Sequence, residues 1–99
     1  MTRVDDEPRP ELTLFVSGAS ELSARAIVSA TELCDIRLGG RYLLSVVDVH
    51  DDPAAASSSG VHATPTLVRA LPLPMHRFVG DLSDADTVLL RLGITDGGP

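Results

Sequence analysis

Four residues that follow the second long apolar run could ligate a metal ion. Asp48, His50, Asp51 and Asp52 place three carboxylates and one imidazole close together in the chain. Carboxylate oxygens suit ions such as magnesium or calcium. Successive side chains at the end of a strand point in different directions, however. We therefore favour a solvated acidic turn that caps the next helix, and we predict no metal site.

The histidines and glycines give no catalytic or cofactor signal. His50, His62 and His76 lack zinc-ligand spacing, and none has a serine or cysteine in a recognised catalytic arrangement. Gly39-Gly40 lacks the lysine and hydroxyl residue of a phosphate-binding loop. We predict surface or loop histidines, no catalytic residues, no cofactor and no enzymatic activity.

Three basic residues stand out in an otherwise acidic chain. Arg69, His76 and Arg77 fall on two adjacent predicted strands, whereas the whole chain has a formal charge of −6. One interpretation is a solvated polar face. The other, which we adopt as a hypothesis, is an electropositive contact for an acidic protein partner.

Composition limits the classes of function. A chain of 99 residues forms one domain, expected at 11–94, with a disordered lead-in at 1–10 and a loose tail at 95–99. An acidic chain with three aromatic residues suits neither phosphate backbones nor base stacking, so we predict no nucleic-acid partner. No run is long enough for a membrane helix or a signal peptide, which predicts no membrane association. One cysteine excludes an internal disulfide and fits a cytoplasmic protein.

The first half of the chain has the pattern strand, helix, strand. Residues 11–17 (ELTLFVS) predict a strand closed by Gly18, and 41–49 (RYLLSVVDV) predict a strand buried on both faces. Between them Ser20 caps a helix that reaches about Ile36. Its buried stripe is expected at Leu22, Ala26, Ile27, Ala30, Leu33 and Cys34, with the cysteine acting as a small apolar residue. The two strands should be parallel.

The second half predicts a hairpin between two helices. Residues 51–60 offer an aspartate cap and a proline for a short helix, although a loop is equally compatible. Strands are expected at 66–71 and 75–79, on either side of Pro72-Leu-Pro74. Ser83 with Asp86 resembles a capping box, and the last helix ends at Gly93. Its expected buried residues are Ala85, Val88, Leu89 and Leu92.

The resulting order, βαβαββα, describes a thioredoxin-like α/β sandwich. Thr64-Pro65 stands where that fold has a cis-proline, although an ordinary trans proline entering an edge strand is the alternative. Redox cysteines would lie in the segment Gly18-Ala19-Ser20-Glu21-Leu22-Ser23, which contains none. Disulfide exchange needs an attacking thiolate, so that activity is excluded there.

Several segments give the chain a resemblance to the KaiB family of circadian clock proteins. The most specific run extends from Ala63-Thr-Pro-Thr-Leu67 through Leu71-Pro-Leu-Pro74 to Gly80-Asp-Leu-Ser83. Weaker support comes from Leu14-Phe-Val-Ser-Gly18, where the family has Leu-Tyr-Val-Ala-Gly, and from Val46-Val-Asp-Val49, where it has Val-Ile-Asp-Val. The resemblance covers about residues 12–92.

The resemblance implies a non-enzymatic regulator that docks on a KaiC-like ATPase in circadian or stress-related signalling. A related domain is the input module of a clock-output histidine kinase, which makes a sensory domain the alternative; an open reading frame ending at Pro99 would favour the regulator. The resemblance also implies a second, ground-state fold, βαββααβ, and leaves a homo-oligomer, dimer or tetramer, open.

Individual positions carry over from the family pattern. Arg69 stands where the family has a hairpin lysine, Arg77 matches the second member of an Arg-Arg pair, and His76 replaces the first. Gly60 and Ser45 replace two further lysines. The residues expected to matter for the structure are Thr64, Pro65, Gly80, Asp81, Arg91 and Gly93. Arg91 replaces a frequent glycine and Gly93 a frequent aspartate; arginine is the better helix former, which favours the thioredoxin-like form.

Overall fold

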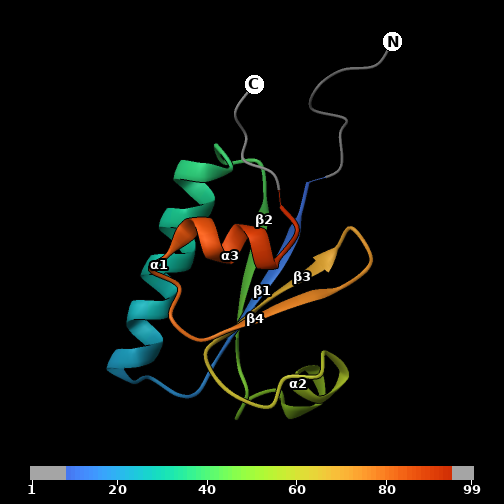
Figure 1. Ribbon diagram of the computed structural model, residues 1–99. Helices are drawn as coiled ribbons and strands as arrows, with labels where there is room; N and C mark the ends of the chain where they lie inside the picture. The colour runs from blue at the N-terminus through green and yellow to red at the C-terminus, as the bar shows by residue number, and fades with distance from the viewer. Residues whose placement is uncertain (1–8, 95–99) are drawn as a thin grey trace.

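A computed structural model describes residues 9–94, so most of the predicted lead-in and the whole predicted tail lie outside the described residues. The element order is β1 (Glu11–Val16), α1 (Glu21–Arg37), β2 (Leu43–Asp48), α2 (Pro53–Ser58), β3 (Thr66–Leu71), β4 (His76–Val79) and α3 (Ala85–Arg91) (Figure 1). This is the predicted βαβαββα order. None of the helices within residues 9–94 combines the length and the apolar character of a membrane-spanning helix.

The four strands form one sheet in the order β2-β1-β3-β4. β1 pairs with β2 in parallel and with β3 antiparallel, while β3 and β4 form the hairpin. Two neighbouring parallel strands need a crossover connection on one face of the sheet, and α1 provides the crossover from β1 to β2. The predicted parallel βαβ unit is therefore confirmed.

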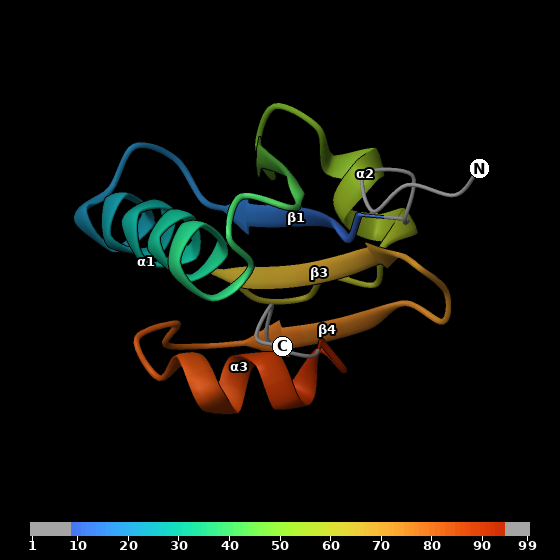
Figure 2. The ribbon, with the colours of Figure 1, turned by 90° about the horizontal axis from the view of Figure 1, so that it is seen from above.

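Helices cover the two faces of the sheet unequally. α1 and α2 lie on opposite sides (Figure 2), and α3 shares the core of α1. Alternate residues of β1 divide between the two cores. Leu12, Leu14 and Val16 face α1 and α3, whereas Phe15 packs with Ala56 and Val68 under the short α2.

α1 begins and ends where local chemistry dictates. The Ser20 hydroxyl accepts the backbone N–H of Ser23 at 3.1 Å, and Gly39 and Gly40 leave the helix with φ of 60° and 80°. Leu22 is a correction to the predicted stripe, since it is 58% exposed. Ser23 is buried in its place, because its hydroxyl donates to the carbonyl oxygen of Ser17 at 3.2 Å.

β2 is a second correction. The aliphatic run predicted a strand at 41–49 buried on both faces, but β2 is an edge strand in which Leu43 is 51% and Val46 46% exposed. An edge strand has a neighbour on one side only, and the six residues of α2 cover little of the sheet.

The segment before the last helix confirms the fold and corrects its cap. The Thr64-Pro65 bond is cis, as are the two other X-Pro bonds before Pro72 and Pro74. Residues 66–79 form the hairpin and 85–91 are helical, so the alternative ground-state packing is not the one adopted. The cap of α3 is Asp84, not Ser83.

Candidate partner-binding hairpin

The strand register places the three basic residues on different faces of the hairpin. Arg69 lies opposite His76 and Val68 lies opposite Arg77. Because side chains alternate along a strand, Arg69 and His76 share the face covered by α3, and Arg77 shares the face covered by α2. The three residues therefore do not share one face of the hairpin.

Arg69 is buried, with 7% of its surface exposed. Its Nη2 donates to the carbonyl oxygen of Pro74 at 2.7 Å and its Nη1 to that of Gly93 at 3.0 Å, while its Nε finds no hydrogen-bond partner among residues 9–94. These bonds tie the hairpin turn and the end of α3 to β3. In this conformation Arg69 is a structural clamp and cannot present an exposed contact.

Arg77 is the exposed cation of the hairpin. Its Nε donates to the carbonyl oxygen of Ser59 at 2.6 Å, which fixes the end of α2 to β4. The guanidinium also lies against Gly60, where an added Cβ would come within 2.6 Å of Nη2. Gly60 has φ of +68°. A lysine at position 60, as in the family pattern, would therefore meet both backbone strain and Arg77.

The segment that follows the hairpin folds back onto Pro65. The N–H of Gly80, whose φ is +121°, donates to the carbonyl oxygen of Pro65 at 3.2 Å. Asp81 then accepts the N–H of Ser83 at 2.9 Å, and this bond lowers the pKa of the carboxyl. Arg91 is exposed in the last turn of α3.

The acidic turn after β2 directs carboxylates to the backbone. Asp48 accepts the N–H of His50 at 2.9 Å, and this bond, with a second from the N–H of Gly18, lowers the Asp48 pKa. Asp52 accepts the N–H of Ala55 at 3.0 Å and caps α2. Across the described residues no three His, Cys, Asp or Glu side chains are arranged to hold a metal ion.

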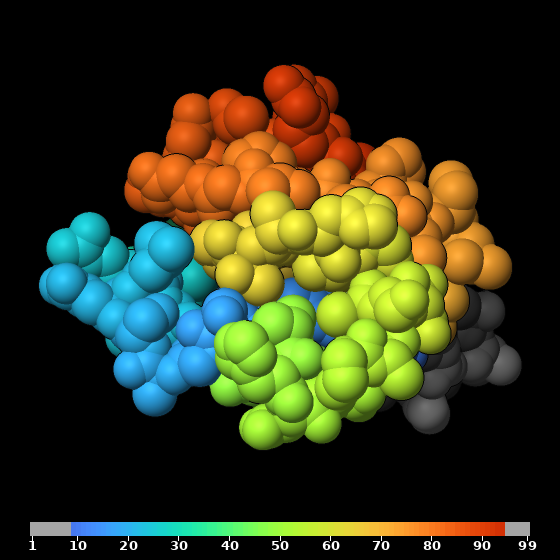
Figure 3. Space-filling model, turned by 90° about the horizontal axis from the view of Figure 1, so that it is seen from below, coloured from blue at the N-terminus to red at the C-terminus, as the bar shows by residue number. Residues whose placement is uncertain are grey.

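The sequence missed one close pair of polar side chains. Ser17 Oγ lies 2.9 Å from His50 Nε2, so a histidine does have a serine neighbour. The two residues follow adjacent parallel strands, whose carboxyl ends meet at one edge of the sheet; Figure 3 shows the blue turn after β1 beside the green turn after β2. That adjacency was the available signal. The pair is exposed. Asp48 accepts the backbone N–H of His50, whereas in a catalytic triad the carboxylate would accept a ring N–H and orient the imidazole.

Cys34 lies on the buried side of α1 and is fully buried, as predicted. Burial, together with the nearby Asp35 carboxylate, raises the pKa of the thiol to about 12. A thiol with such a pKa is protonated and unreactive at neutral pH. Tyr42, whose hydroxyl donates to Asp35 at 2.6 Å, also has its pKa raised to about 12 by that bond.

These features define a thioredoxin-like fold without a thiol at the position used for redox chemistry. Among solved structures, the thioredoxin O2 of Arabidopsis thaliana matches with a TM-score of 0.63 at 19% identity, over 85% of this chain and 75% of that one. The N-terminal domain of Synechococcus elongatus SasA matches with a TM-score of 0.70 at 25% identity, over 88% of this chain and 87% of that one.

Sequence comparisons identify the family. The KaiB domain model matches residues 13–94. The circadian clock oscillator protein KaiB of Synechococcus elongatus is 40% identical over 86 residues, which are 87% of this chain and 84% of that protein. The circadian clock protein KaiB3 of a Synechocystis strain is 37% identical over 94% of this chain and 91% of that protein. The chain belongs to the KaiB family.

Proposed function

We propose that this chain is a non-enzymatic regulatory protein that binds a KaiC-like ATPase in circadian or stress-related signalling. The observation that carries the proposal is the KaiB match over 13–94, with relatives named as circadian clock proteins. The buried Cys34 supports it, because a protonated, inaccessible thiol provides no redox chemistry to a thioredoxin-like fold.

Arg77 is the residue of the hairpin that we assign to the partner contact. It is exposed and held in place by its bond to Ser59, so little side-chain entropy is lost on binding. An arginine at the surface of an acidic chain would steer an acidic partner patch to this site. His76 is half-buried opposite Arg69, and its side chain lies on the face of the hairpin opposite to that of Arg77.

A sensory domain of a clock-output histidine kinase is the second candidate. The observation that favours it is the match to the SasA N-terminal domain over most of both chains. The same ATPase would be the partner in that case, but the output would pass to a kinase rather than to the ATPase itself. Gene neighbours and measured effects on ATP hydrolysis distinguish the two candidates.

The test is a titration with the KaiC-like ATPase encoded in the same genome. We expect binding, and Arg77→Glu should lower the association rate by about tenfold at low ionic strength and by less at high salt. Arg77→Lys keeps the charge and should bind nearly as well. Arg9→Glu, a reversal at another exposed arginine, is the matched control.

The outcomes separate two claims. If the unmodified chain does not bind the ATPase, the proposed function is wrong. If it binds and Arg77→Glu binds as tightly and as fast as Arg9→Glu, the function stands and the assignment of Arg77 is wrong. Circular dichroism of each variant verifies that α2 and the hairpin remain folded.

A further inference from the structure

The end of α2 carries three consecutive serines whose side chains the fold does not use. Ser57 and Ser58 are exposed, and Ser59 is half-buried. Within residues 9–94 none of their hydroxyl groups makes a hydrogen bond, whereas the hydroxyls of Ser20 and Ser23 fix the start of α1. The three hydroxyls can therefore be modified without the loss of a hydrogen bond.

α2 is held to the rest of the molecule by few contacts. It has six residues, and only Ala56 among them is buried. In Figure 3 the yellow-green atoms of α2 lie at the surface. A helix of this length is unstable by itself. Local opening of α2 therefore costs little free energy, and it presents the serines in the extended form that an enzyme's peptide groove accepts.

Arg77 lies directly beside this serine run. Its Nε donates to the carbonyl oxygen of Ser59 at 2.6 Å, and its guanidinium lies against the backbone of Gly60, which has no side chain to cover it. Within residues 9–94 neither Nη atom of Arg77 has a hydrogen-bond partner. The paired N–H donors of an arginine match two oxygens of a phosphate group.

Ser59 is the serine of the run that Arg77 serves. The same residue provides both the carbonyl oxygen bound to Arg77 and a hydroxyl that could carry a phosphate. Successive residues of a helix are rotated by about 100°, so Ser57 projects about 200° away from Ser59. A phosphate on Ser59 would therefore meet the guanidinium, whereas one on Ser57 would face solvent.

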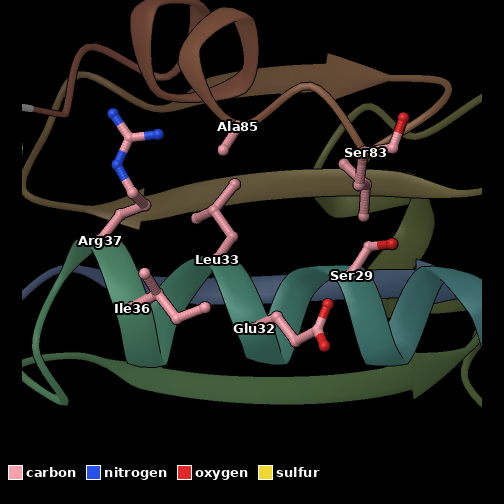
Figure 4. Close-up of a pocket in the computed structure, with 8 residues that line it drawn as sticks. Ser29, Glu32, Leu33, Ile36, Arg37, Ser83 and Ala85 are labelled. Atoms are coloured by element: carbon pink, nitrogen blue, oxygen red, sulfur yellow. The ribbon is translucent and has the colours of Figure 1, made fainter.

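Two other serines lack a comparable arginine. Ser29 and Ser83 border the groove of about 250 Å³ between α1 and the segment before α3 (Figure 4). The arginine of that groove, Arg37, bonds Asp86 at 2.7 Å, and Glu32 adds a second carboxylate that would repel a phosphate. A phosphate on either serine would therefore meet more negative than positive charge.

We propose that Ser59 is a phosphorylation site and that its phosphate pairs with Arg77, which withdraws this arginine from the partner contact. A separate serine/threonine protein kinase supplies the phosphoryl group from ATP. The Ser59 oxygen attacks the γ-phosphorus, the bond from that phosphorus to the departing ADP breaks, and a base of the kinase takes the hydroxyl proton.

The phosphate reverses the charge of the site. It adds about −1.5 to −2 beside the single positive charge of Arg77, so an acidic partner patch would be repelled instead of attracted. This regulatory role rests on the proposed function, whereas the ion pair between the phosphate and Arg77 does not.

Phosphoserine incorporated at position 59 during synthesis tests the ion pair without the ATPase. Urea unfolding is measured with and without the phosphate, in the unmodified chain and in the Arg77→Ala variant. The phosphate should make Arg77→Ala at least about fivefold more costly in the unfolding equilibrium constant. Phosphoserine at position 57 is the matched control, with the same added charge, and should show no such coupling. Equal coupling at the two positions would overturn the proposal.

Two further measurements test the modification and its effect. Mass spectrometry of the chain purified from the cells that produce it naturally should find phosphate on Ser59. In a titration with the KaiC-like ATPase, phosphoserine at 59 should lower the association rate by about tenfold at low ionic strength, and phosphoserine at 57 by clearly less.

The outcomes separate this proposal from the proposed function. No phosphate on Ser59 in growing or in stationary cells, or equal association rates for the two phosphoproteins, would overturn the phosphorylation switch. If the unmodified chain does not bind the ATPase, the proposed function and the switch are both wrong, but the coupling between the Ser59 phosphate and Arg77 is measured independently.

Discussion

Arg69 Nη1 donates to the carbonyl oxygen of Gly93 across 3.0 Å and thereby joins β3 to the residue just beyond α3. The second bond, to Pro74 at 2.7 Å, joins the same guanidinium to the hairpin turn. One buried side chain thus connects three segments of the C-terminal third. The arginine lies in the inner strand β3, where its neighbours Leu67 and Val68 are also buried.

Removing the Arg69 clamp should destabilise the protein strongly. Arg69→Ala leaves a cavity and two carbonyl groups without donors, and we expect a loss of about 2–4 kcal/mol in the free energy of unfolding. Arg91→Ala, at an exposed position near the end of α3, should cost no more than about 0.5 kcal/mol. Urea unfolding of both variants measures the difference, and equal losses would contradict the clamp.

Gly60 and Gly39 allow backbone strain to be separated from a side-chain clash. Both have positive φ, +68° and +60°, so alanine should cost roughly 1–2 kcal/mol at either position. At Gly60 the added Cβ would meet Arg77, at 2.6 Å, whereas at Gly39 no neighbouring atom of the described residues 9–94 lies within 4 Å. Gly60→Ala should therefore lower the melting temperature further than Gly39→Ala. In an Arg77→Ala background the two losses should become similar.

Asp84, rather than Ser83, should control the start of α3. Its carboxylate accepts the hydroxyl of Thr87 at 2.8 Å and the backbone N–H of Thr87 at 3.3 Å, and these bonds lower its pKa. Asp84→Ala should lower the melting temperature by roughly 5 °C at neutral pH. Ser83→Ala should change it much less.

The same carboxylate predicts a pH dependence. A group whose pKa is lowered in the folded state stabilises that state above its ordinary pKa of 3.8 and loses this effect as the pH falls through the lowered value. The difference in melting temperature between Asp84→Ala and the unmodified chain should therefore shrink below about pH 4. A difference that persists undiminished in acid would contradict the ionised cap.

The chain should show no insulin reduction, and Cys34→Ala should leave every redox property unchanged. The native thiol should fail to react with Ellman's reagent until urea unfolds the protein, because it is buried. Its raised pKa also stabilises the folded state below the ordinary value of 9.0, an effect lost as the pH rises toward about 12. Turnover above background with a dithiol would refute the prediction.

Periodicity was sufficient for the elements because it depends on neighbours in the chain. The apolar spacing from Ala26 to Cys34 defines the buried side of α1, and the hairpin follows from the proline-punctuated turn between two β-forming runs. The choice between the two folds rested on weak local helix signals in residues 83–93, and the helical form at Ala85–Arg91 agrees with them.

The errors concern contacts between distant parts of the chain. An aliphatic run does not reveal whether its strand lies at the sheet edge, so Leu43 and Val46 of β2 seemed buried. Arg69 seemed an exposed cation because Pro74 and Gly93, which accept its hydrogen bonds, approach it only in the folded hairpin and helix. Which of Ser83 and Asp84 caps α3 depends on the turn that Asp81 makes before them.

The position of β1 between β2 and β3 has a consequence for how the chain could be divided. Residues up to Ser59 contribute β1, α1, β2 and α2, and residues from Thr66 contribute the hairpin and α3. β1 offers its free edge to β3, and the core joins Leu12 and Leu14 to Leu67 and Leu92 across the same boundary. The exposed link at His62 and Ala63 is thus the place where a cut would leave two fragments with matching strand edges, suited to reassemble without a covalent connection.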